Sequence, residues 1–173
     1  ARLSGMMLDY PKLLDKGIGG LRSDLQEKLK EQPDNNFYKA GIQCLDIFVD
    51  CASHLQQDAR DQMASADEKR QKELERICQA LENIKEKKPG TFHEAMQLFW
   101  LFALLAGVIN YGRLDDYLGP YLVADLESGR LTDEEAYRYI HSLWTMIENR
   151  RTTVNGRIIV GGKGRKHPKE ADV

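Results

Sequence analysis

The stretch that decides the fold is residues 91–109, which read TFHEAMQLFWLFALLAGVI. Thr91 and Glu94 fit a capping box, in which the Thr hydroxyl and the Glu carboxylate satisfy each other's free backbone donors, so a helix is predicted to begin there. Residues 95–109 are apolar on every side apart from Gln97, and such a helix must be surrounded by protein or lipid. Its fifteen residues, at about 1.5 Å each, reach roughly 22 Å, which is short of a ~30 Å hydrocarbon core. We therefore predict a central helix buried in protein, the most buried of the chain.

Upstream of this helix, apolar residues recur at three- and four-residue spacing and predict further helices. Asp9 caps a short helix that ends in the glycines of segment 17–20, and a second helix covers 21–32 and stops before Pro33. Longer helices are predicted over about 37–64 and 67–87. We expect these two to pack as an antiparallel pair.

Downstream, two more helices are predicted over about 115–128 and 133–150, with Gly129 between them. Thr132 and Glu135 form a second capping box at the start of the latter. The fold class is therefore mainly α, with about seven helices.

The last twenty-odd residues change character and favour extended chain. Segments 152–154 and 157–160 are rich in β-forming residues, and Asn155-Gly156 between them is typical of a hairpin turn. Periodicity indicates no partner sheet elsewhere, and a two-stranded hairpin alone is marginal in water. We infer that residues 1–173 are one helical portion of a domain that is truncated at its C-terminal end. The tail is then expected either to be poorly anchored or to pair with another copy, which would give a homo-oligomer.

Composition excludes several classes of protein. The 173 residues carry 30% charged side chains and a formal net charge of -2, so no global field attracts nucleic acid or an anionic membrane. Cys44, Cys51 and Cys78 lie in predicted helices, and the single Cys51–His54 pair lacks the second pair of a zinc site. Residues 1–20 lack the order of a secretion signal. We expect a cytoplasmic protein with reduced thiols, no metal, and neither nucleic acid nor membrane as a partner.

Three clusters could carry chemistry, and each has a plainer interpretation. The segment 160–166, VGGKGRK, could hold a phosphate, although it lacks the P-loop ending and also fits a tight turn. Adjacent Asp115 and Asp116 beside Arg113 could be a catalytic pair, but neighbours on a helix diverge by about 100°, which favours a cap and an ion pair. His93 in the capping box is expected on the surface. A basic cluster at the C-terminal end has no aromatic residue to stack bases and fits a solvated tail or contacts to other protein: Arg150, Arg151, Arg157, Lys163, Arg165, Lys166 and Lys169.

Two stretches in order resemble the pyruvate formate-lyase domain of glycyl radical enzymes. Residues 91–100 read TFHEAMQLFW and residues 111–121 read YGRLDDYLGPY. In that family a Phe-x-Glu-Ala-x-Gln helix precedes a Gly-Arg-x-Asp-x-Tyr-Leu-x-Pro-Tyr stretch. The similarity continues through Asp125-Leu126, Gly129, Leu131-Thr132, segment 134–136 and Leu143-Trp144, and more weakly at Asp9-Tyr10 and segment 17–20.

The resemblance implies a ten-stranded β/α barrel in which a glycyl radical passes its hydrogen-abstracting power to a central cysteine. A separate activating enzyme that uses S-adenosylmethionine installs the radical, and the substrate is a small organic molecule. The family's radical loop has no match in this sequence, and the three cysteines lie upstream of the expected position of the thiyl cysteine. The resemblance therefore implies no bound cofactor and no catalytic residue within these 173 residues, and no turnover by this chain alone.

Departures from the family narrow the substrate. Members that dehydrate diols hold a substrate hydroxyl with a serine just before the Gly-Arg pair, whereas segment 106–110 here reads AGVIN, and Val108 cannot make that bond. Those members also place a histidine in the segment that corresponds to 3–8, where this chain has none. Another lyase or decarboxylase branch, or an unassigned one, is favoured, with Val108, Asn110 and Arg113 as the candidates for substrate-proximal positions. Two alternatives remain: a stand-alone helical scaffold or interaction module, and a phosphate or nucleic-acid binder that uses the basic tail.

Overall fold

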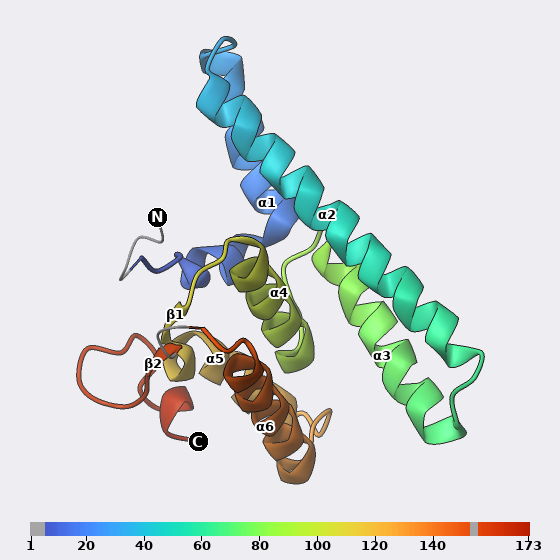
Figure 1. The fold of residues 1–173 in the computed structure, drawn as a ribbon. Coiled ribbons are helices and arrows are strands. Elements are labelled where there is room, and N and C mark those ends of the chain that lie inside the picture. The colour runs from blue at the N-terminus through green and yellow to red at the C-terminus, as the bar shows by residue number, and fades with distance from the viewer. Residues whose placement is uncertain (1–5, 153–155) are drawn as a thin grey trace.

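The computed structural model describes residues 6–152 and 156–173, which form six α-helices, one short 3-10 helix and two strands (Figure 1). In chain order these are α1 (Tyr10–Glu31), α2 (Asn36–Met63), α3 (Glu68–Ile84), α4 (Phe92–Leu105), β1 (Asn110–Arg113), α5 (Leu114–Glu127), α6 (Asp133–Asn149), β2 (Arg157–Ile159) and the 3-10 helix η1 (Glu170–Asp172). The mainly α class is confirmed.

The two helices predicted at the N-terminal end are one kinked element. Asp9 caps α1 as expected, because its carboxylate accepts the Lys12 N–H at 3.1 Å. At Gly17 the backbone leaves the helical region (φ 64°, ψ 178°), and a Cβ there would lie 2.6 Å from the Lys88 nitrogen. The helix resumes at once because the Gly19 N–H donates to the Glu86 carbonyl at 3.0 Å. The expected break is therefore a kink, and the count of about seven α-helices was one too high.

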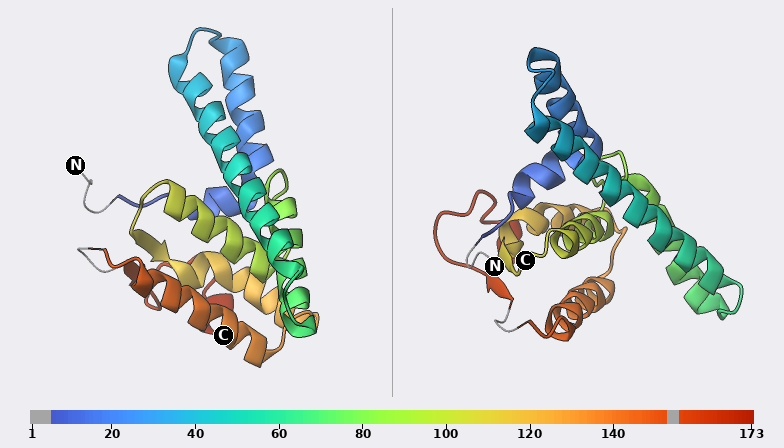
Figure 2. Two further views of the ribbon diagram at one scale, coloured as in Figure 1. Left: turned by 45° about the vertical axis from the view of Figure 1, so that its right-hand side comes forward. Right: turned by 45° about the horizontal axis from the view of Figure 1, so that its top comes forward.

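Helices α2 and α3 pack antiparallel, which confirms the predicted long pair (Figure 2). Asn35 and Asp67 cap their N-termini. Gln56 of α2 is buried, donates to the Cys78 carbonyl at 2.9 Å and accepts from Lys85 at 2.9 Å. This side chain joins the two helices by polar bonds inside an apolar interface.

Helix α4 is the buried centre of the fold, as predicted. Leu98 and Phe99 are 0% exposed and Leu101 is 4% exposed. The helix stops four residues early, however, because Gly107 adopts a left-handed conformation (φ 65°) and the Val108 N–H bonds back to the Ala103 carbonyl at 3.2 Å. This arrangement is a Schellman cap. The predicted extension to residue 109 is wrong, and Leu105 is 46% exposed.

The strand at the C-terminal end does find a partner within the chain. β2 pairs in parallel with β1, with Gly112 opposite Ile158 and Arg113 opposite Ile159, and Met7 forms a parallel bridge to Asn110 on the other side of β1. Helices α5 and α6 make the crossover between the two strands. The expectation of an unpartnered strand was wrong. Of the segment predicted as a strand over 152–154, Thr152 is not in a strand, and residues 153–155, including Asn155 of the predicted turn, lie outside the described residues.

No helix among the described residues is both long enough and apolar enough to cross a membrane.

A buried carboxylate ties the start of α4 to the end of α5. Asp125 is 4% exposed, and its Oδ2 accepts the Phe92 N–H at 2.8 Å, one of the free donors of the first turn of α4. Its Oδ1 accepts from Arg130 Nε at 2.9 Å. The negative charge also complements the positive end of the α4 dipole.

We predict that Asp125→Ala lowers the free energy of unfolding by about 2 kcal/mol, because it leaves the buried Phe92 N–H without an acceptor. Urea denaturation followed by circular dichroism measures the change. Glu127→Ala, an exposed change at the end of the same helix, is the control and is expected to have little effect. Equal stability of the two variants would contradict this role for Asp125.

Candidate functional site

The three residues that were predicted to lie near the substrate are on β1 or just before it. They differ in burial and in which of their hydrogen-bonding groups remain free. Val108 is 4% exposed, and its carbonyl accepts from Arg150 at 2.7 Å. The Asn110 side-chain oxygen accepts the Gly112 N–H at 3.3 Å, which leaves its amide NH2 group without a partner among the described residues. Arg113 is half-buried at the carboxyl end of the strand.

Arg113 and the two following acidic residues hold the glycine-rich tail. The Arg113 guanidinium donates to the carbonyls of Gly161 at 2.9 Å and Lys163 at 3.1 Å. Asp115 accepts the Gly161 N–H at 2.7 Å and Asp116 accepts the His167 N–H at 2.8 Å. The aspartates therefore act as anchors, and the Gly161 N–H that a phosphate would need already donates to a carboxylate.

Part of the basic cluster is likewise engaged with protein. Arg165 pairs with Asp172 and lies 3.7 Å from Asp115. Arg150 donates to the Val108 carbonyl and to the Tyr111 hydroxyl at 2.8 Å, and its guanidinium lies 5.9 Å from the centre of the Trp100 ring. These two arginines therefore contact this chain itself, and not solvent or other protein as predicted.

A cluster of aromatic side chains packs against β1 and holds it in place. Phe99 of α4 contacts the rings of Tyr10, Tyr111 and Tyr117, with centroids 5.0 Å, 5.8 Å and 5.7 Å away. The Tyr117 hydroxyl donates to the Tyr111 carbonyl at 2.7 Å. Burial raises the pKa of both Tyr10 and Tyr117 far above the ordinary tyrosine value, so both phenols stay protonated. The cluster positions the strand and offers no general base.

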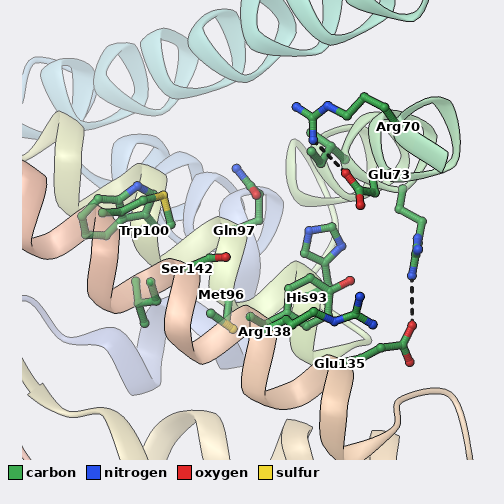
Figure 3. Close-up of a pocket in the computed structure, with 14 residues that line it drawn as sticks. Arg70, Glu73, His93, Met96, Gln97, Trp100, Glu135, Arg138 and Ser142 are labelled. Atoms are coloured by element: carbon green, nitrogen blue, oxygen red, sulfur yellow. Dashed lines mark hydrogen bonds and ion pairs between the residues drawn. The ribbon is translucent and has the colours of Figure 1, made fainter. Parts of the chain in front are cut away.

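A separate groove of about 410 Å³ lies between α3, α4 and α6 (Figure 3). Its base is apolar, with Met96, Trp100 and Leu143 all less than a tenth exposed. Around it are charged side chains that form two ion pairs, Arg70–Glu73 at 3.0 Å and Arg76–Glu135 at 3.4 Å. Helix α6 fully buries only Ala136 and Leu143, while Tyr139, Ile140 and Ile147 pack against the core in part.

His93 lies in this groove rather than on the open surface where it was expected. Its ring stacks on Tyr139 with centroids 4.9 Å apart and an interplanar angle of 14°. Burial, and secondarily the charge of Arg76, lower the pKa of His93 below its ordinary value. The predicted capping box is also only half formed, because the Thr91 hydroxyl accepts the Glu94 N–H while the Glu94 carboxylate accepts from Gly90 and Asn83, each at 2.7 Å.

The cysteines are remote from the strands. Cys44 is exposed and Cys51 half-buried on α2, and Cys78 is buried on α3, all three as free thiols. No group of three or more His, Cys, Asp or Glu side chains placed to hold a metal is found within residues 6–152 and 156–173.

Sequence reasoning missed the groove and the anchoring role of the tail contacts. The groove residues come from three helices, and no local pattern relates them. The tail contacts could have been suspected, because Arg113 and two aspartates occur together in the sequence and the tail offers glycines whose backbone is accessible.

Comparison with known proteins agrees with the geometry. A family model described as pyruvate formate lyase-like matches residues 2–168. Isethionate sulfite-lyase of Bilophila wadsworthia is 30% identical over 153 residues, and the match covers 79% of this chain and 18% of that protein. A probable dehydratase of Escherichia coli is 30% identical over 162 residues, covering 82% of this chain and 20% of that protein. The chain thus spans about a fifth of the length of the curated relatives it matches.

Solved structures show the same fold. A glycyl radical enzyme from Archaeoglobus fulgidus superposes with a TM-score of 0.76 at 24% identity, covering 83% of this chain and 20% of that chain. Hydroxyproline dehydratase from Clostridioides difficile superposes with a TM-score of 0.68 at 23% identity, covering 87% and 21%.

We predict that Arg113→Gln exposes the tail to trypsin. Loss of two hydrogen bonds from a charged donor, at ~1.5 kcal/mol for each, raises the population of the open tail about a hundredfold. Mass spectrometry of the products of brief digestion measures the rate of cleavage after Lys163. Arg151→Gln, outside the tail contacts, is expected to leave that rate unchanged, and an unchanged rate in Arg113→Gln would show that the tail is held by other contacts.

The lowered pKa of His93 predicts how stability depends on pH. Below the ordinary value of 6.5 the unfolded chain takes up a proton that the folded protein resists, so the free energy of unfolding is highest above pH 6.5 and falls as the pH drops. The charged or titratable groups around the ring are Arg76 on α3, Glu94 on its own helix and Tyr139 on α6.

The test is the melting temperature between pH 7.5 and 5.5. We expect the wild type to lose more stability over this interval than His93→Gln, with His141→Gln on the exposed face of α6 behaving as wild type. Identical pH profiles for wild type and His93→Gln would contradict the interpretation.

Proposed function

This chain belongs to the pyruvate formate lyase-like family of glycyl radical enzymes, and we propose that it is a portion of a lyase, dehydratase or decarboxylase that acts on a small organic molecule by radical chemistry. The relatives that it matches are lyases and dehydratases by name. In this proposal residues 1–173 form one helical portion of the family's domain, and the radical glycine and the thiyl cysteine lie outside it.

The observation that carries the proposal is the unit β1–α5–α6–β2. Its two strands are parallel and joined by helices, which is how β/α barrels are built. Parallel strands are normally covered on both faces and flanked by further strands. In this chain Ile159 and Val160, at and just beyond the end of β2, are 48% and 68% exposed. A stand-alone helical module would have no use for such a strand pair, so the pair favours a part of a barrel over the scaffold alternative.

The carboxyl ends of parallel strands are where β/α folds bind ligands. Arg113 ends β1 there, but its guanidinium is engaged with the tail carbonyls, so we propose that it positions the turn after β2 beside the substrate. Asn110 begins β1 and Val108 precedes it, so both lie toward the amino end of the strand, opposite Arg113; Asn110 has a free amide NH2 group there, and Val108 has a buried side chain and an engaged carbonyl. Of the three residues, we therefore propose Arg113 as the one nearest the substrate.

The names of the relatives indicate the size and the chemical class of the substrate. Proteins that act on isethionate, on trans-4-hydroxy-L-proline and on (2S)-3-sulfopropanediol are 26–30% identical to this chain. We propose a substrate of similar size that bears an oxygen substituent. The proposed partners are this substrate and a separate radical-activating enzyme that uses S-adenosylmethionine. Self-association through the exposed edge of β2 remains a further proposal.

The test is formation of the radical. We predict that anaerobic treatment of the 173-residue chain with a family activating enzyme and S-adenosylmethionine gives no glycyl doublet by electron paramagnetic resonance. A longer polypeptide that contains this sequence and the family's radical loop is predicted to give one.

A doublet from the 173-residue chain would place the radical among its own glycines, most simply in the tail around Gly161, Gly162 and Gly164. The assignment of the chain to the part of the enzyme without the radical would then be wrong.

A further inference from the structure

The groove between α3, α4 and α6 has features of a ligand site and no role in the proposed radical chemistry. Its volume of about 410 Å³ falls within the ~300–1,000 Å³ of typical small-molecule sites. Its residues come from the three helices, and the candidate residues of β1 are absent from its lining. The groove is therefore separate from the substrate site proposed above, and whether it binds a ligand does not depend on the radical mechanism.

The charges around the groove do not balance. Three arginines and two glutamates line it, and 3 − 2 leaves one positive charge when His93 is neutral. Arg70 pairs with Glu73 and Arg76 with Glu135, whereas Arg138 has no carboxylate within 4.0 Å in the part of the chain that the structure describes. Arg138 lies at the same end of the groove as His93 and Glu135 (Figure 3). An unpaired guanidinium here favours a ligand with one negative charge.

Uncharged hydrogen-bond donors also line the groove. Gln97 and Ser142 line the groove and make no hydrogen bond among the described residues. Burial raises the pKa of Tyr139, so its hydroxyl remains a donor at neutral pH. The neutral His93 ring carries one N–H. Such donors suit the oxygens of a carboxylate, which accepts several hydrogen bonds at once.

The apolar base of the groove indicates the chemistry of the part of the ligand that carries no charge. Met96, Trp100 and Leu143 are 7%, 8% and 3% exposed and present apolar surface below the polar rim. The stacked pair of His93 and Tyr139 forms a flat wall. A planar apolar body fits this wall and base, while inorganic phosphate has no apolar body to cover them and carries more negative charge than the one free guanidinium balances.

We propose that this groove binds a small organic monocarboxylate with an aromatic or flat apolar body, with Arg138 as the residue that holds the carboxylate. The two exposed ion pairs do not oppose this, because such pairs contribute only ~0.2–1 kcal/mol, and Arg76 can turn from Glu135 toward a bound anion at little cost.

The test uses 3-phenylpropionate as the probe and Trp100 as the reporter. The chain has two tryptophans, so Trp144→Phe leaves Trp100 as the single emitter. In that background we expect a saturable change in Trp100 fluorescence with 3-phenylpropionate. The neutral 3-phenylpropionamide, which has the same body without the charge, should bind about two- to fivefold more weakly, since Arg138 is exposed and an ion pair to an exposed arginine contributes up to ~1 kcal/mol.

Two arginine variants complete the design. Arg138→Gln should weaken binding of the acid about two- to fivefold and leave binding of the amide unchanged, while Arg60→Gln, on α2 away from the groove, should change neither. The comparison of acid and amide in the Trp144→Phe protein holds even if Arg138→Gln does not fold. Equal binding of acid and amide, or a fluorescence change without saturation, would overturn the proposal. So would tighter binding of an oligoglutamate peptide than of 3-phenylpropionate, which would make the groove a protein-docking surface.

Discussion

The structure depends on one constraint: α4 has no face that can meet water over most of its length. Leu98, Phe99 and Leu101 are together almost fully buried, and each such side chain contributes about 1.5–3 kcal/mol when it leaves water. Helices α1, α3 and α5 and strand β1 are placed where they can cover it. The aromatic cluster around Phe99 shows how the covering works, because one ring contacts tyrosines from α1, β1 and α5. The parallel strands are thus held on a hydrophobic centre.

Polar contacts at the ends of the elements fix how these elements lie relative to one another. Asp125 joins the start of α4 to α5, Arg150 joins the end of α6 to β1, and Arg113 joins β1 to the tail. Each of the two arginines bonds to backbone carbonyls far along the chain. They therefore fix where β2 and the tail lie, which apolar packing alone would leave open.

How much the sequence could predict depended on whether the signal was local. The caps at Asp9 and Thr132, the long pair α2–α3 and the burial of α4 all follow from spacing within one segment, and all are present. Strand β1 was missed because its four residues, NYGR, contain a glycine and no β-branched residue, so tertiary pairing rather than propensity makes it extended. The end of α4 was misplaced because Gly107 was counted within an apolar run instead of as a C-cap. The groove depends on the relative placement of three helices, which no periodicity specifies. The family resemblance did reach the correct family, because it rests on the order of several motifs.

In this interpretation the strand pair is a fixed part of this chain and packs against α4. Further strands can extend it into a larger sheet. Amide hydrogen exchange measured by nuclear magnetic resonance tests this most directly. Arg157 donates its N–H to the Ile109 carbonyl at 2.9 Å across the pair. The account predicts that this amide exchanges nearly as slowly as those of Leu98 to Leu101 in α4. Exchange of the Arg157 amide at the rate of an unfolded chain, with α4 still protected, would show that the strands are not held and would contradict the account.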